Sequence, residues 1–365
     1  MYSDSDLEAA VAAGALSPDS AAGLRNFVAG NRSTPHVDEE HFRLLTGFND
    51  IFVAVAAAIL LFALGWIGHY IGPNVFGEGP SPTSGILVGA AAWGLAEFFT
   101  RKRRMALPSI LLLVSFVGAV FYAAGSLIMI GLGEDYLIRN EEQSGFTILA
   151  VSAAIAVAAA WLHWRRFMVP ITVAVGAAAV VALVMALVGL SIDHSADYMD
   201  TIILLTSLVL GLGVFLFAMH WDSSDPRRET RRSDVAFWLH LLSAPLIVHP
   251  IFALLGLTEG EASVTEALIV LLVYVLLGLA ALAIDRRALL VSALAYVLYA
   301  LSELFREFGA VELNVALTAL VIGSALLLLS AFWHNARRAV VRPLPPSLQA
   351  RLPVLDRATV RTVPA

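Results

Sequence analysis

The chain has 365 residues, of which 59% are hydrophobic and 14% are charged, and its mean hydropathy is +0.81. This balance excludes a water-soluble globular domain, and the absence of cysteine excludes disulfides, thiolate nucleophiles and iron–sulfur clusters. The net charge of −6, with no basic stripe, excludes a nucleic-acid partner. We therefore expect an integral membrane protein whose main partner is the lipid bilayer.

Residues 1–48 form a mostly polar, acidic segment ahead of the first apolar run. Ser17-Pro18-Asp19 is typical of a helix start, and it follows a first helix that we expect to end near residue 15. The segment has too little core to be a catalytic domain. We predict a cytoplasmic helical segment that docks on inner loops or binds a cytoplasmic protein partner.

About ten apolar runs follow, and each approaches the length that crosses a hydrocarbon core of about 30 Å. They lie near residues 51–72, 84–100, 106–132, 145–164, 167–192, 201–221, 235–257, 265–284, 288–308 and 311–334. Short connections between several of them force antiparallel neighbours. The sequence predicts an all-α, polytopic transmembrane helix bundle over residues 49–336.

The basic residues predict the orientation of the bundle. All of the 23 basic residues except Arg139 and Arg306 fall in the N-terminal segment, in every second connection or in the C-terminal tail. Short loops rich in Lys and Arg stay in the cytoplasm. Both termini are therefore predicted inside, with an even number of spans, and the acidic connections are predicted outside.

Four predicted inner turns share a pattern in which an apolar helix ends in an arginine pair and a second apolar helix follows. Their reference residues are Arg104, Arg166, Arg232 and Arg287. One reading is a parallel repeat of helical hairpins. The other reading is that the positive-inside rule alone places arginine at every second turn.

Histidines accompany the tryptophans beside these turns. His163, His220 and His334 each neighbour a Trp, and Trp prefers the level of the lipid headgroups. We expect these three histidines to be polar caps at the interface, with ligand or pH-sensing roles as the alternative.

The ninth run carries a polar stripe. Ser292, Tyr296, Tyr299, Glu303 and Arg306 follow one another at spacings of four, three, four and three residues, which places them on one helical face. Ionisable groups at membrane depth are functional hypotheses by default because burying a charge is costly. We predict that this face belongs to a polar pathway.

The seventh run carries His240 and His249, with Pro245 and Pro250 between and after them. The prolines predict a kink or a break, since each removes a backbone donor. Broken helices expose backbone to substrates in transporters, so both histidines join the predicted pathway.

Residues 337–365 are rich in Pro and Arg, and we expect a cytoplasmic tail that is mainly extended. It is predicted to lie along the anionic inner leaflet or over the inner loops.

The segment DLEAAVAAGALSPDSAAGLRNFVA, together with VIGSALLLLSAFWHNARR near the end, resembles a family of bacterial multi-pass membrane proteins of unknown function. The resemblance covers the two ends better than the middle. It implies a bacterial inner membrane and a multi-pass topology, and it implies no catalytic residue.

Three functions fit these patterns. The first is permease-like transport of a small solute or ion along the polar pathway. The second is a non-catalytic membrane scaffold or sensor with a cytoplasmic partner at 1–48 or 337–365. The third and least favoured is an intramembrane enzyme on a lipid-linked substrate, using His249, Glu303 or Asp193-His194. We find no recognised catalytic motif, and we expect no cofactor or resident metal.

Overall fold

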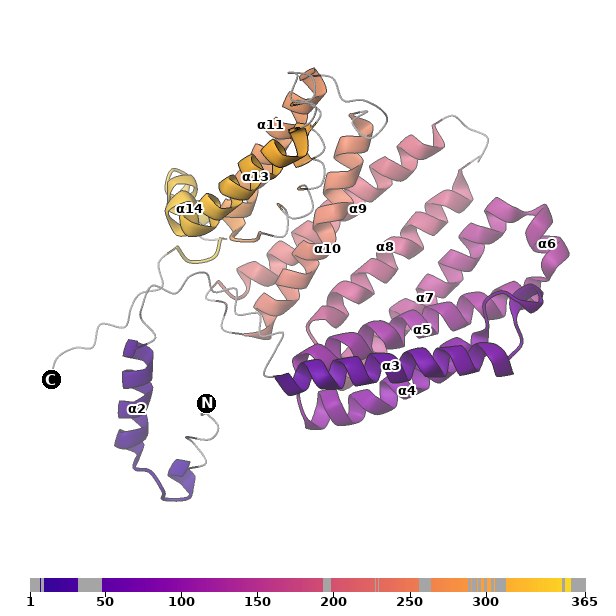
Figure 1. Cartoon of the computed structure of the whole chain (residues 1–365), viewed down its shortest axis with the longest axis horizontal. Coiled ribbons are helices and arrows are strands. Elements are labelled where there is room, and N and C mark those ends of the chain that lie inside the picture. Colours follow the sequence, from indigo (N-terminus) through magenta and orange to yellow (C-terminus); the bar gives the residue numbers. More distant parts are fainter. Residues whose placement is uncertain are drawn as a thin grey trace. The chain divides into compact units, whose positions relative to one another are not determined.

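The computed structural model describes residues 7, 10–31, 48–192, 198–226, 228, 230–255, 264–287, 290, 294, 297–298, 301–302, 305, 313–349 and 352–355. All the regular elements in these ranges are helices, which confirms the predicted all-α class. Figure 1 shows the long helices lying alongside one another.

The chain divides into two units, Met1–Phe42 and Arg43–Ala365. The first unit contains α2 (Pro18–Asn31), which begins at the predicted Ser17-Pro18-Asp19 signal. The Ser17 hydroxyl oxygen accepts a hydrogen bond from the Ser20 backbone N–H at 3.1 Å, so it caps one of the first free donors of the helix.

The second unit is the helical bundle. Its long helices are α3 (Phe48–Ile71), α4 (Pro82–Ala96), α5 (Ala106–Leu132), α7 (Glu141–Phe167), α8 (Ile171–Ser191), α9 (Met199–Ser223), α10 (Arg231–Leu254), α11 (Val264–Ile284) and α13 (Asn314–Ala331). Shorter elements are η1 (Val75–Gly77), η2 (Glu97–Lys102), α6 (Glu134–Arg139), α14 (Trp333–Val341) and α15 (Pro346–Gln349).

Six helices of the described residues are long and apolar enough to cross a membrane: α3, α5, α7, α8, α9 and α10. A seventh is obtained if α13 and α14, which are bent by 75° at their junction, count as one broken span. The predicted second span is the 15-residue α4 followed by a π-helical turn, η2. Most of the predicted ninth span lies outside the described residues, so ten spans stays a prediction.

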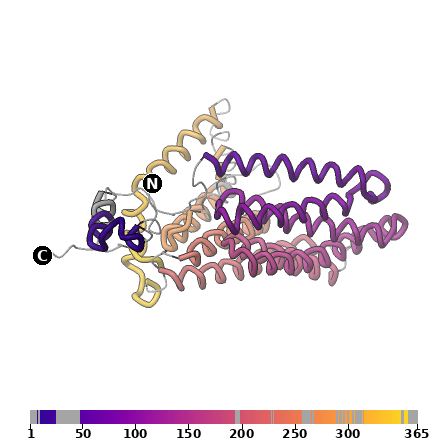
Figure 2. Tube along the Cα trace, turned by 90° about the horizontal axis from the view of Figure 1, so that it is seen from below, coloured from indigo at the N-terminus to yellow at the C-terminus, as the bar shows by residue number. Residues whose placement is uncertain are grey.

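Consecutive helices pack as antiparallel hairpins, with α4 against α5, α7 against α8 and α9 against α10 (Figure 2). Glycines allow some of these helices to approach closely. A Cβ at Gly211 of α9 would lie 2.8 Å from the backbone carbon of Leu246 on α10. Because lipid removes most of the hydrophobic drive between helices, such close backbone contact is what holds spans together.

The sequence predicts a kink or a break in the seventh span; the break is wrong, and the kink stays a prediction. Helix α10 runs continuously through Pro245 and Pro250. Pro250 has no N–H, so it cannot donate to the Leu246 carbonyl four residues earlier. The Ser207 hydroxyl of α9 donates to this carbonyl instead, at 3.4 Å. A neighbouring helix thus supplies the hydrogen bond that proline removes, as is usual in membranes.

Four turns at one end of the bundle share a backbone feature. Arg104, Met168, Arg228 and Asp285 all adopt left-handed φ values between 51° and 57°. They follow α4 with η2, α7, α9 and α11 respectively, so they lie at the end that we call the arginine end. The four arginine-pair turns predicted as a repeat are thus alike in backbone, and repetition itself stays a prediction.

Candidate functional site

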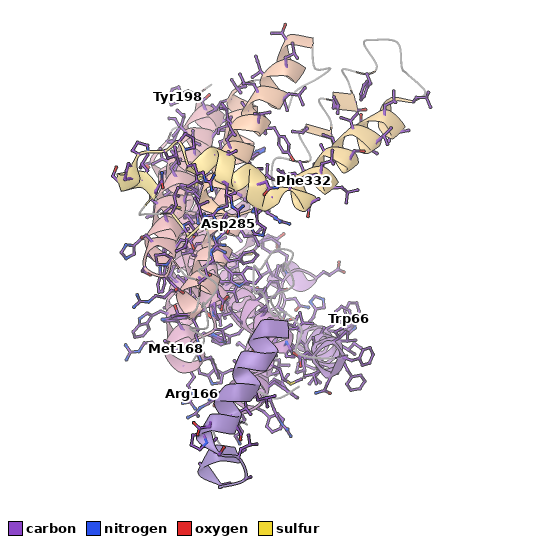
Figure 3. All side chains as sticks on the ribbon, turned by 90° about the vertical axis from the view of Figure 1, so that its left-hand side faces the viewer. Trp66, Arg166, Met168, Tyr198, Asp285 and Phe332 are labelled. Atoms are coloured by element: carbon purple, nitrogen blue, oxygen red, sulfur yellow. The ribbon has the colours of Figure 1, made fainter. Side chains whose placement is uncertain are left out.

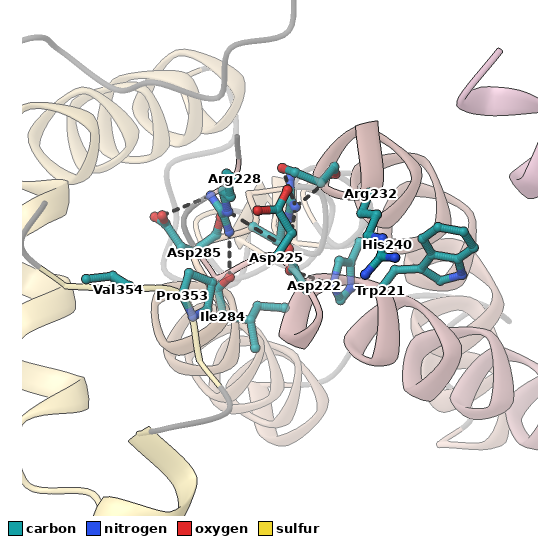
Figure 4. Close-up of polar contacts among 12 residues, drawn as sticks. Trp221, Asp222, Asp225, Arg228, Arg232, His240, Ile284, Asp285, Pro353 and Val354 are labelled. Atoms are coloured by element: carbon teal, nitrogen blue, oxygen red, sulfur yellow. Dashed lines mark hydrogen bonds and ion pairs between the residues drawn. The ribbon is translucent and has the colours of Figure 1, made fainter. Parts of the chain in front are cut away.

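A cluster of polar side chains lies at the arginine end, where α9, α10, α11 and α14 converge (Figure 4). We call it the polar clamp. Its members are Asp222, Asp225, Arg228, Thr230, Ser233, His240, Asp285, Arg286, Trp333 and Arg337.

Asp222, in the last turn of α9, is the centre of the clamp and is 1% exposed. Arg286 donates to both of its carboxylate oxygens, from Nη2 at 2.7 Å and from Nε at 3.2 Å. His240 Nε2 lies 3.3 Å from the same carboxylate. A bidentate guanidinium is the strongest match that a protein offers to a buried carboxylate.

Arg286 also ties the cluster to α10. Its Nη2 donates to the Ser233 carbonyl oxygen at 3.1 Å, and its guanidinium lies 6.0 Å from the centre of the Phe237 ring. Arg286 follows the left-handed residue Asp285, and this turn directs the guanidinium back over the end of α9. The side chain is 2% exposed, so its charge depends on these partners.

Asp285 is the second acidic centre. Arg228 donates to its Oδ2 from Nη1 at 3.0 Å, and the Trp333 indole N–H donates to Oδ1 at 2.7 Å. Burial alone would raise the pKa of Asp285, but Arg228, Arg337 and the Trp333 N–H together hold that pKa below its ordinary value. The carboxylate is therefore charged at neutral pH.

Arg337 of α14 joins the clamp to the C-terminal segment. Its Nη2 donates to the Pro353 carbonyl at 2.6 Å and its Nη1 to the Val354 carbonyl at 3.2 Å. The Val354 backbone N–H donates in turn to the Pro226 carbonyl of the α9–α10 connection at 3.3 Å. Residues 352–355 thus lie against an arginine-end turn, while α14 carries helix as far as Val341.

A second ion-pair site joins η2 and α7 at the same end. Arg166 donates to Glu97 Oε1 from Nε at 2.6 Å and to Oε2 from Nη2 at 2.9 Å. Arg101 donates to Oε2 at 3.3 Å. Figure 3 labels Arg166 and Met168 at this turn, and Asp285 within the clamp.

The two predicted pathway histidines do not share a face. His240 is fully buried in the clamp, whereas His249 is exposed on the bundle surface. They are nine residues apart, and nine steps of 100° bring a helix to its opposite side. Of the other predicted pathway residues, Ser292, Tyr296, Tyr299, Glu303 and Arg306 lie outside the described residues, as does Asp193-His194.

The expectation that His163 caps the interface is wrong. Its side chain is 0% exposed and packs between Trp93, Phe116 and Phe167, with ring centres 4.6 to 6.1 Å away. Its Nδ1 lies 3.4 Å from the Thr172 hydroxyl. His220 and His334 are exposed, as expected of interfacial residues.

Sequence reasoning missed the clamp because it treated the arginine-rich turns only as topology signals. A signal was present: Asp222, Asp225 and Asp285 are acids within predicted inner turns, against the general placement of acids outside. Acids among arginines in a short turn are candidates for local ion pairs.

The described residues hold no group of three or more His, Cys, Asp or Glu side chains that could bind a metal ion. The larger grooves described on the bundle are apolar and lie among α3, α4, α5 and α7, away from the clamp. In the clamp, acidic side chains are paired with arginines from other elements, so its role is to hold the helix ends together.

Comparisons with known proteins add no assignment: no protein-family model, no curated protein and no solved structure matches the chain. The bacterial family suggested by the two ends of the sequence is therefore not identified by these comparisons. The apolar helices nevertheless imply a lipid bilayer, and the chain is a multi-pass integral membrane protein.

Proposed function

We propose that the protein is a non-catalytic membrane scaffold or sensor whose polar clamp presents the C-terminal segment to a cytoplasmic partner. The observation that carries the proposal is that Arg337 binds Asp285 on one side and the carbonyls of Pro353 and Val354 on the other. The ends of three apolar helices and the segment after α14 thereby meet in one charge network.

Burial of the polar groups supports the same reading. Asp222, His240 and Arg286 are almost completely buried, and both His240 and Arg286 contact Asp222. A solute route needs polar side chains that water reaches, whereas buried charges with matched partners specify one arrangement of the helices.

The test uses the absence of natural cysteines. We would introduce Leu352→Cys and measure its labelling by a membrane-impermeant maleimide in inside-out vesicles, with and without Arg337→Ala. We expect slow labelling in the otherwise wild-type chain and at least severalfold faster labelling with Arg337→Ala. The exposed Arg342→Ala is the matched control and should leave the labelling rate unchanged.

Transport of a small solute or ion is the second candidate, because the polar stripe Ser292, Tyr296, Tyr299, Glu303 and Arg306 on the ninth run would suit a route. Reconstituted liposomes distinguish the two proposals. Saturable flux of a solute that is lost in Glu303→Gln, and kept in Arg337→Ala, would replace the scaffold with a permease.

A further inference from the structure

A lateral groove on the bundle is lined by α4, α5 and α7 and has a volume of about 660 Å³. Its lining is apolar: Gly85, Ile86, Gly89, Ala90, Trp93, Phe116, Val120, Ala123, Ala124, Leu127, Ile155 and Leu162. Several of these side chains remain exposed on the bundle surface, Ile86 at 56% and Leu162 at 49%. In a bilayer this surface faces acyl chains.

One end of the groove leads to the Glu97–Arg166 ion pair. On α4, Ile86, Ala90 and Trp93 line the groove, and Glu97 follows Trp93 by four residues on the same face. On α7, Arg166 follows the lining residue Leu162 by four residues. The salt bridge of 2.6 Å between the two helices therefore lies about one turn, or about 6 Å, beyond the apolar lining.

This end of the groove is strongly basic. Six exposed basic residues lie on the two adjoining turns: Arg101, Lys102, Arg103, Arg104, Arg165 and Arg166. Glu97 is the carboxylate among them, so the site has a net charge of about +5. The Glu97 contacts use two of the five N–H groups of Arg166 and leave other donors on Arg101 and Arg166.

Aromatic rings mark the level at which this charge lies. The Arg165 guanidinium is 5.2 Å from the Trp161 ring, and the Arg103 guanidinium is 5.5 Å from the Phe98 ring. Trp161 is 59% exposed. Exposed Trp beside Arg is the arrangement found at lipid headgroups, where one end of a side chain is apolar and the other is wet.

We propose that this surface is a binding site for an anionic phospholipid, with one acyl chain in the α4–α5–α7 groove and the phosphate at Arg101 and Arg166. From Gly85 in α4 to Glu97 at the start of η2, the helical segment extends about 18 Å, close to the 15 Å or so of one leaflet. Glu97 acts as a positioning residue that holds the two guanidinium groups together. The net positive charge selects an anionic headgroup over a zwitterionic one.

The test measures lipid binding to the purified full chain by native mass spectrometry, with phosphatidylglycerol and phosphatidylcholine of identical acyl chains. We expect tighter binding of phosphatidylglycerol. The double variant Arg101→Gln with Arg166→Gln should weaken the binding of phosphatidylglycerol roughly 20- to 30-fold, as removal of two surface cations predicts. The control, Arg231→Gln with Arg232→Gln, removes the same charge from another turn and should change the affinity for phosphatidylglycerol far less.

The groove is tested separately by Ala90→Trp, which fills it at an exposed position and leaves every charge in place. This variant should weaken the binding of both lipids by a similar factor and keep the preference for phosphatidylglycerol. Three results would each overturn the proposal. They are equal affinity of the wild type for both lipids, an equal loss of phosphatidylglycerol affinity in the two double arginine variants, and displacement of the lipid by glycerol phosphate alone at equal concentration.

Discussion

Asp222 is a fully buried carboxylate at the end of an apolar helix, and its position depends on Arg286, 64 residues later. The pair satisfies both oxygens of the acid, while Ser233 accepts a further bond from the guanidinium. Such a pair contributes little net stability, but losing one partner leaves an uncompensated buried charge.

Arg286→Met should therefore destabilise the bundle by about 3 to 5 kcal/mol, and Asp222→Asn with Arg286→Met should recover part of this loss. Thermal unfolding in detergent of the wild type, both single variants and the double variant measures the coupling. Additive effects of the two substitutions would contradict the assigned ion pair.

The lowered pKa of Asp285 makes one contribution to stability dependent on pH. In the unfolded chain an Asp titrates near 3.9, so the contribution is fully present above about pH 4 and is lost as the pH falls through the folded-state value. Asp285→Asn should lower the thermal midpoint by a constant amount between pH 5 and 8. The difference from the wild type should shrink below about pH 4; a difference that grows there would reverse the sign of the shift.

At the scale of elements, small residues decide how closely two helices pack. Gly211 has no room for a Cβ against Leu246, while Gly213, two residues further along α9, has no atom within 4 Å of that position. The two glycines lie on opposite sides of the helix. Alanine substitutions at the two positions can therefore be compared directly, because the two sites are in the same helix and differ in their packing.

Gly211→Ala should therefore destabilise the α9–α10 hairpin by about 1 to 3 kcal/mol, because the helices must separate. Gly213→Ala should be neutral or slightly stabilising, since Ala is the better helix former. The thermal midpoints of the two variants in one detergent provide the comparison. If Gly213→Ala lowered the thermal midpoint as much as Gly211→Ala, the effect would come from helix propensity instead of packing.

At the scale of the whole molecule, the orientation in the membrane stays a prediction. Because the chain has no cysteine, single substitutions report sidedness directly. Arg103→Cys and Arg232→Cys should react with an impermeant maleimide only in inside-out vesicles, and Glu78→Cys and Glu141→Cys only in right-side-out vesicles. Reaction of Arg103→Cys and Glu141→Cys from the same side would refute the predicted topology.

Much of the fold followed from composition and run length. The apolar run 106–132 predicts a span, and α5 has the same bounds. An apolar run in lipid must satisfy its backbone hydrogen bonds within itself, and it does so as a helix. The break at the prolines of α10 could not be excluded from one segment, since the compensating donor, Ser207, belongs to another helix.

Local composition is enough to predict a multi-pass helical membrane protein with arginine gathered at alternate turns, since neither property depends on which helices pack together. Which polar side chains meet depends on how the helices pack. His240 lies in the clamp while His249 faces outward, and Glu97 pairs with Arg166, 69 residues away. The physical reason is that an ion pair depends on distance in space, and helix packing brings together charges that the sequence keeps far apart.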